Sequence, residues 1–528
     1  MAQREEWGTR IGLILAMAGN AVGLGNFLRF PVQAAQNGGG AFMIPYFIAF
    51  ILLAVPLMWI EWTIGRYGGK FGHGSLPGMF DAMWRNPIAK YAGVIGIFAA
   101  TSVMIYYTYI ESWTLAFSFF SLTKEYFGMN NFESMTNFLH SFQGSSKGYF
   151  NNIWTSYFFV LITFGINFYI LSKGLKGGIE KFAKIAMPLL ILFAIILVIW
   201  VFTVGTPDPV NHPERNIESG FAFIWNPNLT LLSDAKIWLA AAGQVFFTLS
   251  VGMTTLHTYA SYLKPKDDIA LSGLATASIN EFVEVILGAS IAIPIAVAFF
   301  GVQQTKIIAI GGAYNLGFVS MPIIFQQIPF GNILGFIWFF LLFFAGITSS
   351  VAMAQPLISF LKEQFNFPHR KATNIVALLI FISLQFVVFY YEHGWLDEMD
   401  YWAGTFGLTI VALTESIVFG WIFGIDKGWS ELLKGADINI PIIFKFIIKY
   451  ITPIYLIIIM IFWTYKEALP TLLFQQLDTS GNPLVNPNDI PYRIAARIFM
   501  IAMIIIFLFL IKKGWKNKKY DYDLIDED

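Results

Sequence analysis

The fold is decided by Gly19-Asn20-Ala21-Val22-Gly23-Leu24-Gly25-Asn26, a stretch that interrupts an apolar run from Ile11 to Phe30. Three glycines and two asparagines within eight residues are poor helix formers. In hydrocarbon, an unpaired backbone polar group costs several kcal/mol, so a break persists only where the freed carbonyls and amides face protein, water or a ligand. The stretch therefore predicts a binding site in the middle of a broken membrane helix.

The composition is that of a membrane protein. Of the 528 residues, 56% are hydrophobic and 12% are charged, whereas soluble proteins carry about 25% charged residues. We therefore expect one polytopic transporter domain over 1–528 instead of several soluble domains. The net charge is zero, which implies no nucleic-acid partner. The chain has no cysteine, which excludes disulfides, thiolate catalysis and cysteine-based metal sites.

Apolar runs long enough to cross a bilayer, roughly 20 residues each, recur along the whole chain. We expect an all-α integral membrane protein with twelve transmembrane helices, near 11–37, 41–66, 88–123, 153–172, 179–204, 238–263, 270–300, 332–361, 372–391, 399–424, 443–465 and 490–512.

The distribution of positive charge predicts the orientation. When the connections are assigned to alternate sides, one set holds 24 of the 33 lysines and arginines. The positive-inside rule then places both termini in the cytoplasm. The opposite connections, 124–152, 205–237 and 301–331, are longer. The last of them contains the segment 311–317, whose composition favours short helices that dip inward.

A second interruption lies in the sixth expected span. Residues 246–255 place hydroxyl side chains and Gly252 in the middle of 238–263. Interrupted helices that open successive sets of five spans are typical of inverted-repeat transporters with a site at the bilayer midplane. We expect a first five-helix repeat over 11–204, a second, inverted one over 238–424, two further helices over 443–512 and a cytoplasmic tail over 513–528.

Five motifs carry a resemblance to a known family. They are Gly-Asn-Ala-Val-Gly-Leu-Gly-Asn-Phe-Leu-Arg-Phe-Pro within 7–31, Pro-Leu-Met-Trp-Ile-Glu-Trp at 56–62, Tyr-Ile-Glu-Ser-Trp at 109–113, Gly-Gln-Val-Phe-Phe-Thr-Leu-Ser at 243–250 and Asp-Glu-Met-Asp at 397–400. With these motifs the chain resembles the neurotransmitter:sodium symporter family over essentially its whole length.

The resemblance implies the LeuT fold, with a 5+5 inverted repeat and broken helices 1 and 6. It also implies a secondary transporter, not an enzyme, that couples sodium to the uptake of neutral hydrophobic L-amino acids by alternating access. We expect a multi-pass protein of the plasma membrane (the inner membrane of a bacterium). A homodimer is compatible with the sequence, which does not determine the oligomeric state.

The resemblance further implies two sodium sites built from neutral oxygen atoms, the ligands that suit a hard cation. The first site takes oxygens of Ala21, Asn26, Thr248 and Asn280, and the carboxylate of the bound amino acid completes it. The second takes oxygens of Gly19, Val22, Ala345, Thr348 and Ser349. From the residues alone, the hydroxyls of Thr348 and Ser349 are equally consistent with bonds to carbonyls one turn earlier in their own helix.

An amino-acid substrate needs partners for both of its charges. By resemblance, the carboxylate faces the amides of Leu24 and Gly25 and the Tyr107 hydroxyl. The substrate's remaining neighbours are Asn20, Ala21, Phe247, Thr248 and Ser250, with Val103, Met253, Ser349 and Met353 completing the pocket for its side chain. Amine carriers of this family have an aspartate where this chain has Gly23. A glycine there predicts a substrate that brings its own carboxylate. The two methionines are compatible with substrates that have aliphatic or larger hydrophobic side chains.

Further ionisable residues inside the spans resemble the family's gates and anion site. Arg29 and Asp400 resemble the outer gate pair, with Tyr107 and Phe247 below them, although two snorkelling interfacial residues would have the same pattern. Arg4 matches the inner gate arginine, and its partner is Glu363. Glu284 lies one turn beyond Asn280, where chloride-dependent relatives have a small polar residue, and this predicts chloride independence.

The remaining features point to no other chemistry. The six histidines show no metal-ligand spacing, and His257 favours a packing role over proton coupling. Glu61 and Glu111 favour structural pairing. A proton-coupled or polyamine-type carrier on the same fold is the alternative within the same class. An ion channel would need a continuous polar pore, and an intramembrane enzyme would need a nucleophile or a metal set.

Overall fold

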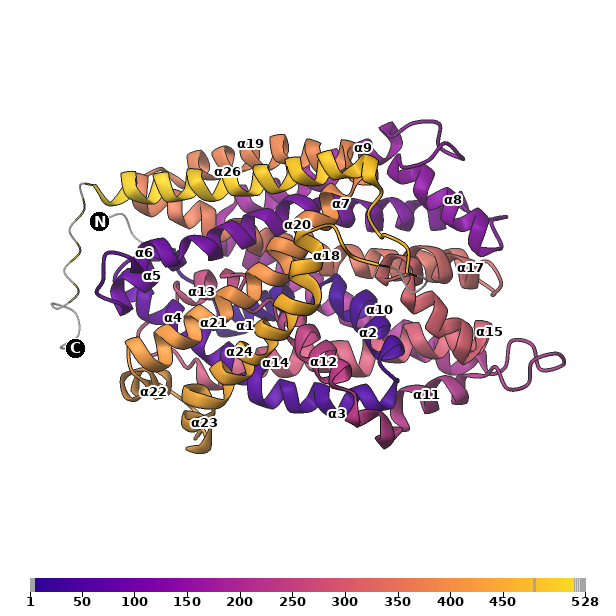
Figure 1. The fold of residues 1–528 in the computed structure, drawn as a ribbon, viewed down its shortest axis with the longest axis horizontal. Helices are drawn as coiled ribbons and strands as arrows, with labels where there is room; N and C mark the ends of the chain where they lie inside the picture. The colour runs from indigo at the N-terminus through magenta and orange to yellow at the C-terminus, as the bar shows by residue number, and fades with distance from the viewer. Residues whose placement is uncertain (1–4, 478–480, 517, 519, 521, 523–528) are drawn as a thin grey trace.

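The computed structural model describes residues 5–477, 481–516, 518, 520 and 522. They fold into helices that lie mostly along one common direction (Figure 1). The first half comprises α1 (Arg10–Ala21), α2 (Phe30–Gln36), α3 (Gly40–Ala49), α4 (Val55–Lys70), α5 (Leu76–Met83), α6 (Ala89–Ala92), α7 (Val94–Thr123), α8 (Phe132–Gln143), α9 (Trp154–Ser172) and α10 (Lys181–Val204).

The middle of the chain comprises α11 (Ile217–Trp225), α12 (Ala235–Thr248), α13 (Thr255–Ala260), α14 (Ala270–Glu281), α15 (Ala289–Ile310), α16 (Ala313–Asn315), α17 (Met321–Phe325), α18 (Gly331–Phe365) and α19 (His369–Phe389). The last part comprises α20 (Trp395–Met399), α21 (Leu408–Ile417), α22 (Ile425–Leu433), α23 (Ile443–Phe446), α24 (Thr452–Trp463), α25 (Leu469–Leu472) and α26 (Ile490–Trp515).

Short π-helical segments extend several of these helices, a local geometry that is common at functional sites. Those that matter for the site are η1 (Gly25–Arg29), η5 (Phe282–Gly288) and η8 (Asp400–Gly407).

The prediction of an all-helical membrane protein is confirmed. In the described part of the chain, ten helices are long and apolar enough to cross a membrane, and the pair 10–21 and 25–36, bent by 47°, makes an eleventh. The span expected over 238–263 is divided between α12 and α13, each of which is too short to cross alone. Counting both broken spans, the helices agree with the twelve expected.

Both interruptions lie where the sequence places them. α1 ends at Ala21, the following Val22 leaves the helical region with φ of −74° and ψ of 98°, and η1 begins at Gly25. Between α12 and α13 the chain adopts positive φ at Ser250 (54°), Gly252 (80°) and Thr254 (58°). A Cβ atom on Gly252 would lie 2.4 Å from the carbonyl oxygen of Leu408, so this glycine allows the break to touch α21.

The broken helices are held by continuous ones. α7 and α18 pack along much of their length, and α18 also contacts α1 and α13. α8, α11 and α17 gather at one end of the molecule, on the right in Figure 1, while α5, α6 and α22 lie at the other end. α26 runs between the two ends and finishes beside α6, so the described end of the chain lies at the end that carries α5 and α22.

Candidate functional site

The side chains predicted for the first cation site lie together between the two breaks. The Asn26 amide nitrogen is 2.8 Å from Asn280 Oδ1 and 3.3 Å from Thr248 Oγ1. The Asn280 amide nitrogen is 2.9 Å from Thr248 Oγ1. With the Asn280 amide turned over, its nitrogen lies 3.2 Å from the Ala21 carbonyl oxygen and 3.3 Å from that of Thr248. Side chains from η1, α12 and α14 and the carbonyl at the end of α1 thus meet at one buried place.

The residues of the second predicted cation site also meet. The Ser349 hydroxyl lies 3.4 Å from the Gly19 carbonyl oxygen and 3.2 Å from that of Ala345. The Thr348 hydroxyl lies 3.1 Å from the same Ala345 oxygen, and a Cβ atom on Gly19 would be 3.1 Å from Thr348 Cβ. Val22 lies at the adjacent end of α1. Thr348 and Ser349 also bond to carbonyls one turn earlier, so the alternative geometry is present beside the contact with α1.

The break in the first span faces Tyr107. The Leu24 amide donates a hydrogen bond of 3.0 Å to the Tyr107 hydroxyl. A Cβ atom on Gly23 would lie 3.0 Å from that hydroxyl and 3.1 Å from Ser349 Oγ. The site therefore has little room for a side chain at position 23, and the amide of Leu24 already points to a polar partner.

Hydroxyl groups surround the carbonyl of Asn20. Ser250 donates to this oxygen at 3.0 Å and Ser349 at 3.2 Å. The Asn20 side chain donates to Thr255 Oγ1 at 2.9 Å, so it ties the first break to the start of α13. The two interrupted helices thus contact each other directly, through side chains and freed backbone oxygens.

A cavity of about 280 Å³ lies at the first break, lined by residues of α2, α7, α16 and η8. Leu24, Gly25, Tyr107 and Phe247 belong to its lining. A Cβ atom on Gly25 would lie 2.7 Å from the Phe247 ring, so the ring packs directly on the backbone of the break. Three further predicted pocket residues are buried and do not belong to this lining: Val103, Met253 and Met353.

Arg29 and Asp400 line the same cavity, and their contacts go to aromatic residues. The Arg29 guanidinium carbon lies 4.1 Å from the centre of the Phe247 ring. Asp400 accepts a hydrogen bond of 2.6 Å from the Tyr106 hydroxyl. Among the described residues no ion pair joins Arg29 to Asp400. The two charges therefore face one cavity without closing it, and Tyr106 is a neighbour that the sequence analysis did not single out.

Glu284 lies at the edge of the first cation site. Its carboxylate accepts hydrogen bonds from Gln244 (2.7 Å) and Asn26 (3.1 Å), and it is fully buried. The neighbouring Glu281 accepts a bond of 2.9 Å from the Tyr46 hydroxyl. One carboxylate thus touches a predicted cation ligand, while the other pairs with a tyrosine.

The segment that precedes α1 covers α13, at the place where the sequence predicts the inner entrance. The Trp7 indole donates to the Tyr259 carbonyl at 3.0 Å, and the two rings meet edge to face at 5.3 Å. Glu5 pairs with Lys362 at 2.9 Å. Glu363, the predicted inner gate residue, accepts a bond of 2.5 Å from the Gly74 amide. Arg4, its predicted partner, lies outside the described residues.

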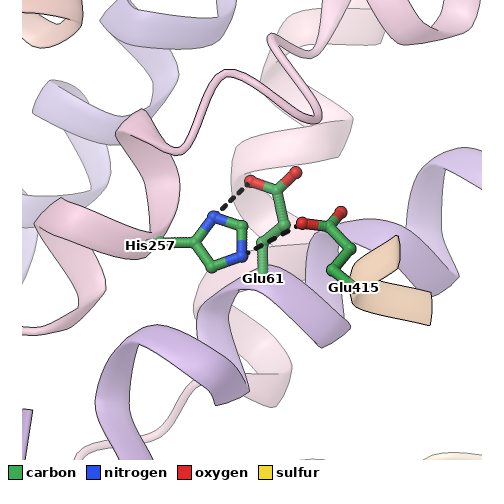
Figure 2. Close-up of side chains that lie close together, drawn as sticks. All are labelled: Glu61, His257 and Glu415. Carbon is green, nitrogen blue, oxygen red and sulfur yellow. Dashed lines mark ion pairs between the residues drawn. The ribbon is translucent and has the colours of Figure 1, made fainter. Parts of the chain in front are cut away.

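One cluster was missed by the sequence analysis. Glu61, His257 and Glu415 meet in the interior, with a carboxylate oxygen near each nitrogen of the imidazole ring (Figure 2). The three residues belong to α4, α13 and α21, so no spacing along the chain could show that they meet. The only signal was that each is an ionisable residue inside an apolar span. Glu111, by contrast, accepts bonds from the Asn167 amide, in keeping with a structural pair.

Comparison with known proteins identifies relatives along most of the chain. The model of the sodium:neurotransmitter symporter family matches residues 4–206 and 135–513. An uncharacterized sodium-dependent transporter of Methanocaldococcus jannaschii is 31% identical over 464 residues, which cover 86% of this chain and 89% of that protein. Another, from Haemophilus influenzae, is 27% identical over 476 residues, or 87% of this chain and 98% of the relative.

Among solved structures, MhsT in complex with L-phenylalanine superimposes with a TM-score of 0.73 at 26% identity. The match covers 87% of this chain and 99% of the MhsT chain.

Proposed function

Because this chain belongs to the sodium:neurotransmitter symporter family, whose members are sodium-dependent symporters, we propose that it carries neutral hydrophobic L-amino acids together with sodium. Transport proceeds by alternating access across the plasma membrane, with both termini in the cytoplasm. The two breaks belong to inverted repeats over 11–204 and 238–424, and two sodium ions bind beside them.

The observation that carries this proposal is the meeting of two kinds of backbone group at the first break. On one side of it, the Gly19 carbonyl accepts from the Ser349 hydroxyl, and the Ala21 carbonyl lies 3.2 Å from the turned-over Asn280 amide. On the other side, the Leu24 amide points to the Tyr107 hydroxyl. Carbonyl oxygens suit a cation and amides at a helix start suit a carboxylate. Sodium and an amino acid can therefore complete each other's site, which is a physical basis for coupling.

Two observations support an amino-acid substrate over an amine. A side chain at position 23 would crowd the Tyr107 hydroxyl and Ser349, so the protein does not supply a carboxylate there. The related MhsT was solved with L-phenylalanine. The hydrophobic class is supported by the buried side chains of Val103, Met253 and Met353, and the flexible methionines suit substrates of several shapes.

Uptake into liposomes tests the proposal. Purified protein is reconstituted, and labelled L-phenylalanine is offered with an inward gradient of sodium or of potassium. We expect uptake with sodium only, and competition by unlabelled leucine, methionine or tryptophan but not by glutamate, lysine or dopamine. Equal uptake in both salts would contradict sodium coupling, and competition by dopamine would contradict the substrate class.

The contact between Glu284 and Asn26 leads to a prediction about chloride. The carboxylate supplies a negative charge beside the first sodium site, so wild-type uptake is expected to be the same in chloride and in gluconate. Glu284→Ser removes that charge, and uptake in gluconate is expected to fall about tenfold or more, since 1.4 kcal/mol corresponds to a factor of ten. Added chloride is expected to restore part of it.

Glu281→Gln is the matched control for this substitution, because Glu281 is one turn away and bonds to Tyr46. We expect this variant to stay indifferent to chloride. Glu284→Ser transport at the wild-type rate in both anions would exclude the proposed role of Glu284.

A further inference from the structure

The cluster of Glu61, His257 and Glu415 lies where the second break meets two other helices (Figure 2). His257 Nδ1 is 3.3 Å from Glu61 Oε2, and His257 Nε2 is 3.1 Å from Glu415 Oε2. All three side chains are 0% exposed. Glu61 Oε1 also accepts a hydrogen bond of 2.6 Å from the Gly252 amide in the break itself. The cluster therefore connects α4, the break and α21.

The distances imply a count of protons. Each nitrogen–oxygen contact requires one hydrogen between its two atoms, so the cluster holds at least two protons. With two protons and two glutamates its net charge is −1, wherever the protons reside. A single uncompensated charge in a dry interior is costly. A third proton makes the cluster neutral.

The place for the third proton is Glu415 Oε1. This buried oxygen has no hydrogen-bond donor among the described residues. The charged groups that act on the His257 ring are Glu61 from α4 and Glu415 from α21. α1 and α18 also pack against α13, and in the described ranges they bring no charged group to the ring. In these ranges, therefore, no basic side chain is present that could neutralise the cluster in place of a third proton.

The geometry favours protons over a metal ion. A histidine binds one ion through one nitrogen, with the carboxylates gathered on the same side. Here the two nitrogens of one ring face two different carboxylates. This arrangement is that of a ring with an ion-pair contact at each of its two nitrogens. The closest predicted sodium ligand in the chain, Thr248, belongs to the preceding helix α12.

The cluster lies behind the entrance that Trp7 covers. His257 is two residues from Tyr259, whose carbonyl accepts the bond from the Trp7 indole. The alternating access proposed above requires this entrance to open, and water from that side then reaches α13. A hydrated cluster can carry a charge of −1, whereas a sealed one favours neutrality.

We propose that Glu61, His257 and Glu415 form a proton-binding site that takes up one proton from the solution at this end when the entrance closes over it, and releases it there when the entrance opens. The step is an acid–base exchange: the proton adds to Glu415 Oε1 from water and returns to water, and no other bond changes. The proposal goes beyond the proposed function, and only its link to the transport cycle rests on it.

Infrared spectroscopy of the purified full-length protein tests the proton directly. A protonated carboxylic acid has a carbonyl band that a carboxylate lacks. The difference between wild type and Glu415→Gln, followed from about pH 5 to about pH 9, is expected to contain this band and to lose it as the pH rises. The glutamine can accept the bond from Nε2, so the ring keeps its contacts. A difference spectrum that lacks the carboxylic acid band at every pH would overturn the proposal.

Transport tests the coupling. Closing the entrance consumes a proton and opening releases one, so sodium-driven uptake of phenylalanine by wild type is expected to fall toward both high and low pH. Glu415→Gln is expected to lose this dependence and to show a flat profile. An unchanged pH profile in Glu415→Gln would overturn the coupling. Absence of uptake in wild type would instead contradict the proposed function, and the infrared result would still stand.

Two further variants keep the test sharp. Glu61→Gln, on the other side of the ring, is expected to flatten the profile as well, and it serves if Glu415→Gln does not fold. His393→Gln is the control, because His393 also contacts a carboxylate, that of Asp489 at 2.8 Å, but lies far along the chain from the breaks. Its profile is expected to match wild type. Loss of the pH dependence in His393→Gln would overturn the assignment to the cluster.

Discussion

Asn26→Leu is expected to abolish sodium-coupled uptake at ordinary sodium concentrations. The Asn26 amide is fully buried and holds four groups together: it accepts from the Gly23 amide at 2.8 Å and donates toward Asn280, Glu284 and Thr248. Leucine has a similar size but removes an oxygen from the cation site and leaves Glu284 without one of its donors.

The size of this effect follows from the charged partners. A hydrogen bond to a charged group contributes about 1.5–3 kcal/mol, so the sodium concentration for half-maximal binding is expected to rise by at least about tenfold. Binding of radioactive sodium to the purified protein measures this directly. Asn37→Leu is the matched control, because Asn37 ends the same broken span and bonds only to Gln33 in the described structure. An unchanged sodium affinity in Asn26→Leu would exclude Asn26 as a ligand.

Tyr107→Phe is expected to weaken the binding of the amino acid far more than that of sodium. The substitution removes one oxygen atom and keeps the ring, which is buried in the core. That oxygen lies 3.0 Å from the Leu24 amide, the group we assign to the substrate carboxylate. Loss of a hydrogen bond to a carboxylate is expected to raise the half-saturating phenylalanine concentration by about tenfold or more.

Measured as KM at saturating sodium, this change separates a substrate contact from a structural one. Tyr109→Phe is the control on the same helix, since the Tyr109 hydroxyl donates to the Gln143 carbonyl at 3.1 Å and does not belong to the lining of the cavity. We expect its KM to match wild type. A Tyr107→Phe protein with wild-type KM and a lowered maximal rate would contradict the role that we assign to the hydroxyl.

Local chemistry made the two breaks predictable. Glycine and asparagine are poor helix formers, so a break within Gly19–Asn26 was predicted, and the structure interrupts the span between Ala21 and Gly25. The sixth span was a weaker case, because Ser250 and Thr254 are tolerated in membrane helices. The break in this span depends on Gly252, which has a positive φ and lies close to Leu408. Both are properties of the packed structure that the sequence can only suggest.

The gates were less predictable, because they depend on which side chain reaches which partner. Arg29 and Asp400 were expected to face one another. Instead, Phe247 takes the guanidinium and Tyr106 takes the carboxylate. Both charges line one cavity, so their location was predictable while their partners were not. A long side chain can contact neighbours from several helices, and the distances between those helices cannot be derived from the sequence.

The cluster around His257 could not be predicted from the spacing of residues along the chain. Two of its members favoured a packing or structural role when taken alone, and the six histidines were searched for ligand patterns along the chain. Glu415 lies more than 150 positions after His257, and only the crossing of α4, α13 and α21 brings the three together. An ionisable residue in each of three apolar spans is a signal for such clusters, but it does not identify the partners.

The central claim is that sodium and a hydrophobic amino acid move together through the site between the two breaks. Concentrative uptake tests it most directly. Liposomes that contain the protein are first equilibrated with labelled phenylalanine at equal concentration inside and outside, and sodium is then added outside only. The account predicts that the amino acid accumulates inside above the outer concentration, and that sodium placed only inside drives it out. Label that stays at equal concentration under both gradients would contradict the account.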